Sequence, residues 1–174
     1  MLLEFIAKGL RDTDDVDVID IRKVPLFNEN YKGKTPKVVA DIDRRVAAAD
    51  AVIIASPEYN HSITSALKSM VEWLSYELHP LENKPVMIIG ASTHEQGSSR
   101  SQVQLRDILI SPGVNAHVFQ GEEFFMSNVA DMIDEDGNIT DEGTVIFLNK
   151  CISEFKPYAE AINGMVAKKE AAKD

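Results

Sequence analysis

The sequence has little cysteine, little positive charge and no long apolar run. Cys151 is the single cysteine, which excludes a disulfide framework and a cysteine-rich metal site. Lys and Arg number 18 against 28 Asp and Glu, giving a formal net charge of -10, whereas a nucleic-acid surface needs clustered cations. No segment approaches the roughly 20 apolar residues of a membrane span. These shortages predict a cytoplasmic protein whose partners are neither nucleic acid nor membrane.

The remaining composition is that of one globular domain. The chain has 174 residues, of which 44% are apolar, enough for a single sizeable core. We assign residues 1–166 to this domain. Residues 167–174, AKKEAAKD, have high helix propensity but almost nothing apolar to bury, so we expect this tail to fray.

The hydrophobic period changes repeatedly along the chain and predicts an α/β fold. Helical spacing of apolar residues is found at 1–10, 36–49, 63–75, 99–110 and 141–162, and strands are predicted at 16–21, 51–55, 85–91 and 114–119. The strands at 51–55 and 85–91 are continuously apolar, which is typical of strands covered on both faces. Strands alternating with helices favour a central parallel sheet between two helical layers, a three-layer arrangement.

Two polar loops follow the two most apolar strands, at residues 56–62 and 92–98. Ligands of open parallel sheets bind beyond the carboxyl ends of the strands. In the first loop, Asn60 or Ser62 could cap the next helix, but capping alone does not require the whole PEYN stretch. In the second loop, Gly97 and small hydroxyl residues let the backbone approach a flat ligand. We therefore expect the loops to form two walls of a slot.

Other interpretations of these residues are also possible, including purely structural roles, a hydrolase site and a metal site. Pro57 could set a turn, with Glu58 solvated, Tyr59 packed and His61 exposed. The pairing of His61 with Ser62 lacks the G-x-S-x-G elbow of a hydrolase. The four histidines (61, 79, 94 and 117) lack close ligand spacing, so no metal site is predicted.

The stretch SPEYNHSITSALKSMVEWLS, residues 56–75, resembles the signature of the NADPH-dependent FMN reductase family of flavodoxin-like proteins. In that family a strand, [ST]-P-E-Y-N and a helix containing a Leu-Lys pair follow in this order. The segments AAADAVIIA, DIRKVPLFNEN, KPVMIIGAS and DEDGNITDE extend the likeness over nearly the whole chain. The resemblance implies a flavodoxin-like fold and an oxidoreductase that uses FMN with NADPH or NADH.

The resemblance also implies where the cofactor binds. It places Pro57, Glu58, Tyr59 and Asn60 on one edge of the isoalloxazine ring, and Ser92, Thr93, His94 and Gly97 along the other side. Arg100 and His61 are candidates for contact with the substrate or NADPH, although Arg100 could equally be an exposed residue in a helix's first turn. No catalytic side chain is named, because the cofactor carries the hydride chemistry.

A subunit interface is implied as well. In the family, the helix corresponding to residues 63–75 packs in a dimer interface near the flavin, so a homodimer or homotetramer is expected. Met70 and Trp73 could contribute to this interface or to the core.

The sequence departs from the family at its beginning. Family members begin with an apolar strand and a Gly-Ser-x-Arg loop that holds the FMN phosphate, whereas MLLEFIAKGL reads as a helix. The comparison with the family therefore predicts that the given sequence lacks the first strand and the phosphate loop. We expect the natural chain to carry roughly 15 to 20 further residues before Met1, enough for one strand and its loop.

Two functions remain open at this point. The first is an FMN-dependent oxidoreductase that transfers hydride from NAD(P)H to FMN and on to a flavin, quinone, azo or metal-oxyanion acceptor. The alternative is a flavin-free member of the family that acts as an interaction protein.

Overall fold

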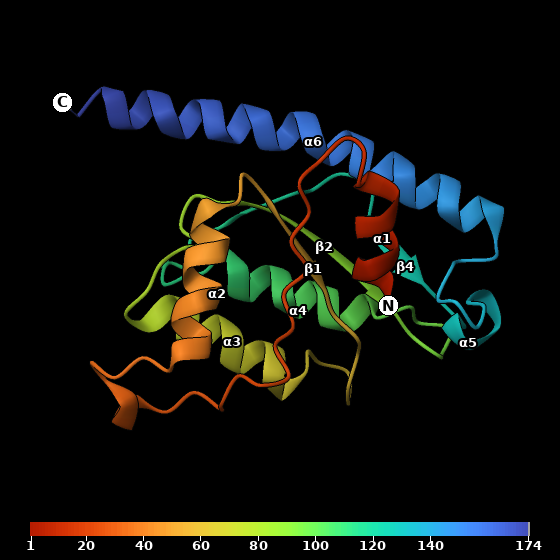
Figure 1. Cartoon of the computed structure of the whole chain (residues 1–174), viewed down its shortest axis with the longest axis horizontal. Coiled ribbons are helices and arrows are strands. Elements are labelled where there is room, and N and C mark those ends of the chain that lie inside the picture. Colours follow the sequence, from red (N-terminus) through yellow and green to blue (C-terminus); the bar gives the residue numbers. More distant parts are fainter. Residues whose placement is uncertain (174) are drawn as a thin grey trace.

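A parallel sheet lies at the centre of the computed structural model, which describes residues 1–173 (Figure 1). The middle strand is β2 (Pro85–Ala91), and β1 (Val52–Ala55) pairs with one of its edges. Two short strands, β3 (His117–Val118) and β4 (Phe124–Met126), pair with successive parts of the other edge. Residues 85–90 of β2 are all buried, as predicted for a strand covered on both faces.

Helices cover both faces of this sheet. One apolar cluster contains α2 (Lys37–Ala48), α3 (Ser65–Tyr76) and α4 (Ser99–Leu109), and the other contains α1 (Leu2–Leu10) and α6 (Glu142–Ala171). Alternate residues of β2 divide between them: Val86 and Ile88 pack in the first cluster, and Met87 and Ile89 in the second. The predicted three-layer, flavodoxin-like fold is confirmed.

The C-terminal helix shows how the sequence produces one of these layers. Asp141 caps α6 by accepting a hydrogen bond from the Thr144 amide at 2.7 Å. Its buried residues recur three or four positions apart: Leu148, Cys151, Ile152, Phe155 and Ala159. Burial raises the pKa of the Cys151 thiol to about 11, so this side chain serves as an apolar core residue. No helix within residues 1–173 is both long and apolar enough to cross a membrane.

Several element boundaries differ from the sequence predictions. The strand expected at 114–119 is reduced to β3, because residues 111–114 form a turn in which the Val114 amide bonds to the Ser111 carbonyl. The short helices at Glu29–Tyr31 and Val129–Met132 (α5), like β4, were not predicted. Helix α6 continues to Ala171, so residues 167–171 are helical; Asp174 lies outside the described residues. Fraying of this tail and the single-domain division stay predictions.

The predicted strand at residues 16–21 is wrong. The segment has no strand partner among the described residues, and β1 pairs only with β2. Alternating apolar residues cannot make a strand without a neighbouring backbone to complete the hydrogen-bond ladder. Ile19 and Ile21 instead pack against the first apolar cluster, and Arg45 donates a hydrogen bond to the Val18 carbonyl at 3.2 Å.

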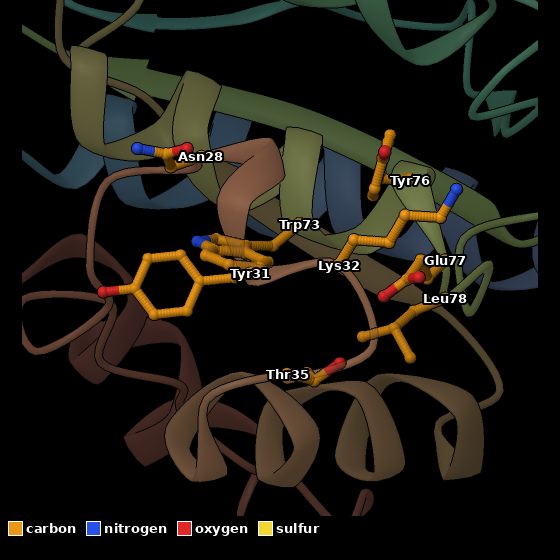
Figure 2. A pocket seen from close by; sticks show the side chains of 8 residues that line it. All are labelled: Asn28, Tyr31, Lys32, Thr35, Trp73, Tyr76, Glu77 and Leu78. Atoms are coloured by element: carbon orange, nitrogen blue, oxygen red, sulfur yellow. The ribbon is translucent and has the colours of Figure 1, made fainter.

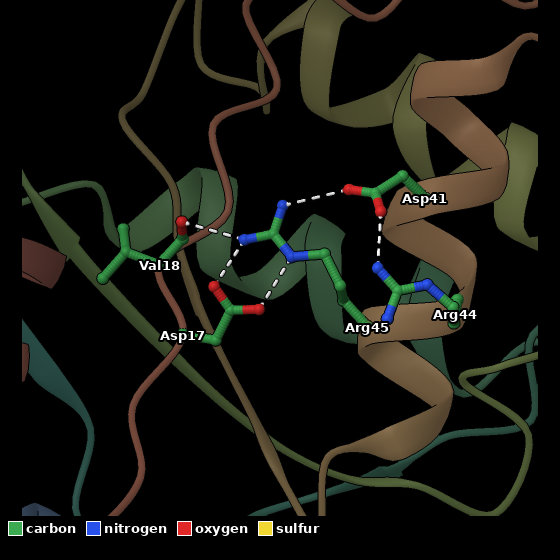
Figure 3. Close-up of polar contacts among 5 residues, drawn as sticks. All are labelled: Asp17, Val18, Asp41, Arg44 and Arg45. Carbon is green, nitrogen blue, oxygen red and sulfur yellow. Dashed lines mark hydrogen bonds and ion pairs between the residues drawn. The ribbon is translucent and has the colours of Figure 1, made fainter.

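Arg45 anchors this segment to α2 (Figure 3). Its Nε donates to Asp17 Oδ2 at 2.7 Å, and its Nη1 lies 3.5 Å from Asp41 Oδ2. Asp41 also accepts a hydrogen bond from Arg44 at 2.6 Å. The hydrogen bond from Arg45 lowers the pKa of Asp17. Side-chain contacts therefore hold residues 16–21 where a strand ladder does not.

We expect Arg45→Gln to lower the free energy of unfolding at pH 7 by less than about 1 kcal/mol, because Asp17 is largely exposed and its ion pair is screened. A carboxylate with a lowered folded pKa stabilises the fold above its unfolded pKa of about 3.9, and this contribution is lost as the pH falls through the folded value. Urea unfolding at pH 7 and at low pH should show the difference from wild type shrinking with acidity. An unchanged difference would mean that Arg45 acts through packing rather than through its charge.

Candidate active site at the carboxyl edge of the sheet

Three loops meet at the carboxyl edge of the sheet. The first loop (residues 56–62) follows β1, the second (residues 92–98) follows β2, and the third (residues 127–128) follows β4. Parallel pairing continues past the strands: the Ser56 amide donates to the Ile89 carbonyl at 3.0 Å, and the Ser92 amide to the Met126 carbonyl at 2.9 Å. The first two loops lie at the same edge of the sheet, as expected, and the slot between them stays a prediction. The third loop was missed because β4 was not predicted.

Gly90 is the point where these loops come into contact with α4. A Cβ atom on Gly90 would lie 1.7 Å from Ser98 Oγ, 2.7 Å from the Ser56 carbonyl oxygen and 2.9 Å from Gln102 Nε2. All three of these neighbours are buried. Only a glycine fits here, and a glycine inside an apolar strand is the sequence signal of such a close approach.

The first loop is a tight hairpin with a strained tip. The Tyr59 amide donates to the Ser62 carbonyl at 2.9 Å, and the Ser62 amide to the Tyr59 carbonyl at 3.0 Å. Asn60 and His61, between them, both have positive φ (50° and 64°), the backbone of a type I′ turn. The hairpin leaves Tyr59 66% exposed.

Two other side chains position this hairpin. Gln104 of α4 accepts a hydrogen bond from Ser62 Oγ at 2.6 Å and donates one to the His61 carbonyl at 2.9 Å. The suggested capping of α3 by Asn60 or Ser62 is wrong: the cap is Thr64, whose hydroxyl accepts from the Leu67 amide at 3.1 Å. Asn60 and Ser62 therefore serve the hairpin and not the helix.

We expect His61→Gly to raise the free energy of unfolding by up to about 1 kcal/mol, because glycine adopts a positive φ without the strain that a side chain incurs. Asn60→Gly is the matched control, since asparagine tolerates this conformation and gains less from the change. Thermal unfolding of both variants provides the comparison. A loss of stability in His61→Gly would show that the imidazole makes a contact that outweighs the strain.

Glu58 links the first loop to the start of α4. Its carboxylate accepts a hydrogen bond from the Arg100 amide at 3.0 Å and one from Arg100 Nη1 at 3.4 Å. The Glu58 side chain is only 9% exposed, whereas that of Arg100 is 49% exposed. The structure thus brings together two predicted site residues, Glu58 and Arg100. The alternative interpretation, in which Glu58 is simply solvated, is wrong because its side chain is largely buried.

The second loop is held against β4 and the third loop. Ser92 Oγ accepts a hydrogen bond from the His94 amide at 3.1 Å, and Ser127 Oγ donates to the Glu95 carbonyl at 2.7 Å. Gly97 has φ +57°, and a Cβ atom there would lie 2.8 Å from the Cβ of Phe125. An open hollow of about 320 Å³ lies beside the loop, lined by Thr93, His94, Glu95, Gln96 and Asn128.

These loops offer what the polar edges of a flat flavin ring require. Within the described residues, the amide groups of Asn60, Thr93 and Glu95 have no hydrogen-bond acceptor in the chain. Thr93 and Glu95 line the open hollow, whereas Asn60 lies in the first loop, outside its lining. Free amides beside a polar hollow can donate to ring oxygen and nitrogen atoms. The residues present therefore fit the ring of FMN, although the individual contacts expected of Pro57, Tyr59 and the other site residues stay predictions.

The suggestion that Met70 and Trp73 contact another subunit is wrong for this chain, because both are buried in its core. Figure 2 shows Trp73 beside Tyr31 at a second hollow, whose other lining residues are Asn28, Lys32, Thr35, Tyr76, Glu77 and Leu78. This hollow has a volume of only about 10 Å³, close to the minimum for one water molecule. It is too small for a cofactor.

The parallel sheet between two helical layers, with polar loops at its carboxyl edge, places the protein in the class of flavodoxin-like proteins. Comparison with known proteins gives the family. The NADPH-dependent FMN reductase family matches residues 1–131, most of the chain. The protein belongs to this family of oxidoreductases. The predicted enzyme class and the cofactors FMN and NAD(P)H are thereby confirmed.

Individual relatives support the same assignment. The NADH:(hydroxy)cinnamate reductase subunit CrdA of Vibrio ruber is 35% identical to this chain. The alignment covers 99% of this chain and 86% of the Vibrio protein. The NADH-dependent flavin reductase subunit 2 of Lactobacillus johnsonii is 33% identical, and the alignment covers 90% of this chain and 87% of the Lactobacillus protein. The structure of FerB, a flavoenzyme NAD(P)H:(acceptor) oxidoreductase from Paracoccus denitrificans, superposes with a TM-score of 0.81 at 26% identity, covering 92% of this chain and 88% of that one.

Proposed function

We propose that the protein holds FMN between its first and second loops and transfers electrons from NADH or NADPH to a small planar acceptor, such as a free flavin or a quinone. Two observations support this proposal: Ser56 of the first loop and Ser98 of the second loop both approach Gly90, and the open hollow beside the second loop is lined by residues that include Thr93 and Glu95, whose amides are free. The names of two relatives support it, since the Vibrio protein is named for NADH and hydroxycinnamate and the Lactobacillus protein for NADH and flavin.

In this proposal the chain contributes binding and orientation. Bound FMN supplies the hydride and electron chemistry between the dinucleotide and the acceptor. The amides of Asn60, Thr93 and Glu95 would donate to the polar edges of the ring and stabilise negative charge there, as preorganised dipoles do. The bonds between Glu58 and Arg100 keep the first loop in place. No side chain is required to act as a general base.

We also propose that the protein acts in the cytoplasm as a homodimer or homotetramer that uses the helix at 63–75. Most apolar side chains of α3 are already buried in the chain, so the contact would use the exposed residues Ser65, Ala66 and Tyr76. Light scattering on the purified protein would give the assembly size, and Ala66→Arg should shift it toward monomer. A monomeric wild type would contradict this part of the proposal.

Turnover with defined acceptors tests the enzymatic function. Purified protein loaded with FMN should oxidise NADH or NADPH when benzoquinone or free FMN is supplied under anaerobic conditions, and the rate should depend on both loaded flavin and acceptor. Absence of flavin-dependent oxidation with both dinucleotides would contradict the proposal. It would favour the alternative, a flavin-free interaction protein.

A further inference from the structure

Helix α4 holds the first loop at two points. At the start of the helix, the Arg100 amide donates a hydrogen bond to the Glu58 carboxylate at 3.0 Å. Four residues later, Gln104 accepts a hydrogen bond from Ser62 Oγ at 2.6 Å and donates one to the His61 carbonyl at 2.9 Å. Residues four positions apart lie on the same face of a helix, so one face of α4 holds both ends of the loop.

The same helix is fixed to the second loop and to the sheet. Ser98 ends the second loop and directly precedes α4, and its Oγ accepts a hydrogen bond from Gln102 Nε2 at 3.2 Å. Gln102 also donates to the Phe124 carbonyl of β4 at 3.0 Å, and Ser98 and Gln102 are both buried. Hydrogen bonds inside a protein are stronger than those exposed to water. Helix α4 therefore sets the position of the first loop relative to the second.

Gln104 contacts the part of the first loop that is least favourable by itself. His61 has a φ of 64°, and non-glycine residues keep such a conformation only where surrounding contacts hold it. A glutamine side chain suits this place, because its oxygen accepts the hydroxyl of Ser62 while its NH2 group donates to the His61 carbonyl. The Asn60 amide, which has no acceptor within residues 1–173, lies in the same hairpin tip.

We propose that Gln104 is a positioning residue for the flavin: by holding the hairpin tip, it orients the Asn60 amide toward the ring. This inference rests on the proposed function, in which FMN lies between the first and second loops. Without the Gln104 side chain the tip can leave its strained conformation, and flavin binding must then also order the loop, which lowers the affinity. Reduced FMN loses more affinity than oxidised FMN, because an oriented amide stabilises the negative charge of the reduced ring.

Titration with FMN, followed by quenching of flavin fluorescence, tests the effect on affinity. Gln104→Ala should raise the dissociation constant about tenfold, since two hydrogen bonds to the tip are lost, and Ser62→Ala, which removes one of them, should raise it about threefold. The double variant should bind FMN no more weakly than Gln104→Ala alone. Gln120→Ala is the matched control, because it removes an exposed glutamine outside α4 and the three loops and should leave the dissociation constant within about twofold.

The midpoint potential of the bound flavin separates positioning from a purely structural role. Reductive titration against a reference dye should show a potential about 30 mV lower in Gln104→Ala, which corresponds to a tenfold greater loss of affinity for reduced than for oxidised FMN. A dissociation constant within twofold of wild type, or an equal loss of affinity for the two forms, would overturn the inference.

Folding and the proposed function are checked separately. Gln104 is exposed, so its replacement should leave the core intact, and urea unfolding of the flavin-free variants measures this directly. If Gln104→Ala fails to fold, Ser62→Ala still decides, because FMN binding equal to that of wild type would contradict a role for this contact. Failure of the proposed function has a different result, namely no FMN binding by wild type.

Discussion

Gly90→Ala is expected to lower the free energy of unfolding by about 3 kcal/mol and to weaken FMN binding at least tenfold, because an added methyl group has no room in a packed core. Its Cβ would overlap Ser98 Oγ at 1.7 Å and press on the Ser56 carbonyl at 2.7 Å. Relief requires α4 to move away from β2, which separates the first loop from the second. Both losses can be measured, by urea unfolding and by quenching of FMN fluorescence.

Gly113→Ala provides the control for this experiment. A Cβ atom on Gly113 would have no neighbour within 4 Å, so the substitution adds a methyl group without a clash. Stability and FMN affinity should stay close to those of wild type. If Gly90→Ala behaves like Gly113→Ala, the close contact at Gly90 does not hold the loops together.

Trp73→Ala should lower the free energy of unfolding by about 3 to 5 kcal/mol, the usual cost of deleting a buried aromatic side chain. The ring is 5% exposed, lies edge-on to Phe27 at 5.1 Å between centroids, and is 5.7 Å from Tyr31. Its Nε1 donates to the Pro25 carbonyl at 2.8 Å. Loss of the indole therefore frees the loop before α2 as well as creating a cavity.

A milder variant and a second readout separate core packing from subunit contact. Trp73→Phe retains an aromatic ring at this position and should cost clearly less than Trp73→Ala. Neither variant should change the assembly size of the folded protein, because Trp73 is covered by its own chain. A change in mass by light scattering, with stability retained, would show that Trp73 contacts another subunit.

Local patterns predicted the parts of the fold that depend on local burial. The run PVMIIGA became β2 with the predicted bounds, and α2 and α4 begin and end within one residue of their predicted ranges. Residues 16–21 and β4 could not be predicted in this way, because strand formation depends on which backbone lies alongside. Three residues of β4 are too few to show a period.

The candidate site was also predictable only in part from the sequence. The rule for ligands at the ends of parallel strands, together with the PEYN resemblance, indicated the first two loops. The contacts that fix their shape join residues far apart in the sequence: Glu58 with Arg100, His61 with Gln104, and Gly90 with Ser98. Asn128 was missed because its loop follows the unpredicted strand β4. Side-chain pairing of this kind follows from the packed fold and is not visible in a single sequence.

The most direct test of a flavin site between the first and second loops is a titration of wild type, Gly97→Ala and Gly137→Ala with FMN. Visible absorption near 450 nm monitors binding, and NADH is then added under anaerobic conditions to bleach the bound flavin. Both glycines have positive φ, so both substitutions strain the backbone, but only a Cβ at Gly97 would meet a neighbour, Phe125 at 2.8 Å. We predict that wild type and Gly137→Ala bind FMN equally and bleach, and that Gly97→Ala binds at least about tenfold more weakly. Failure of wild type to bind FMN, or equal binding by all three proteins, would contradict a flavin site between the first loop (residues 56–62) and the second loop (residues 92–98).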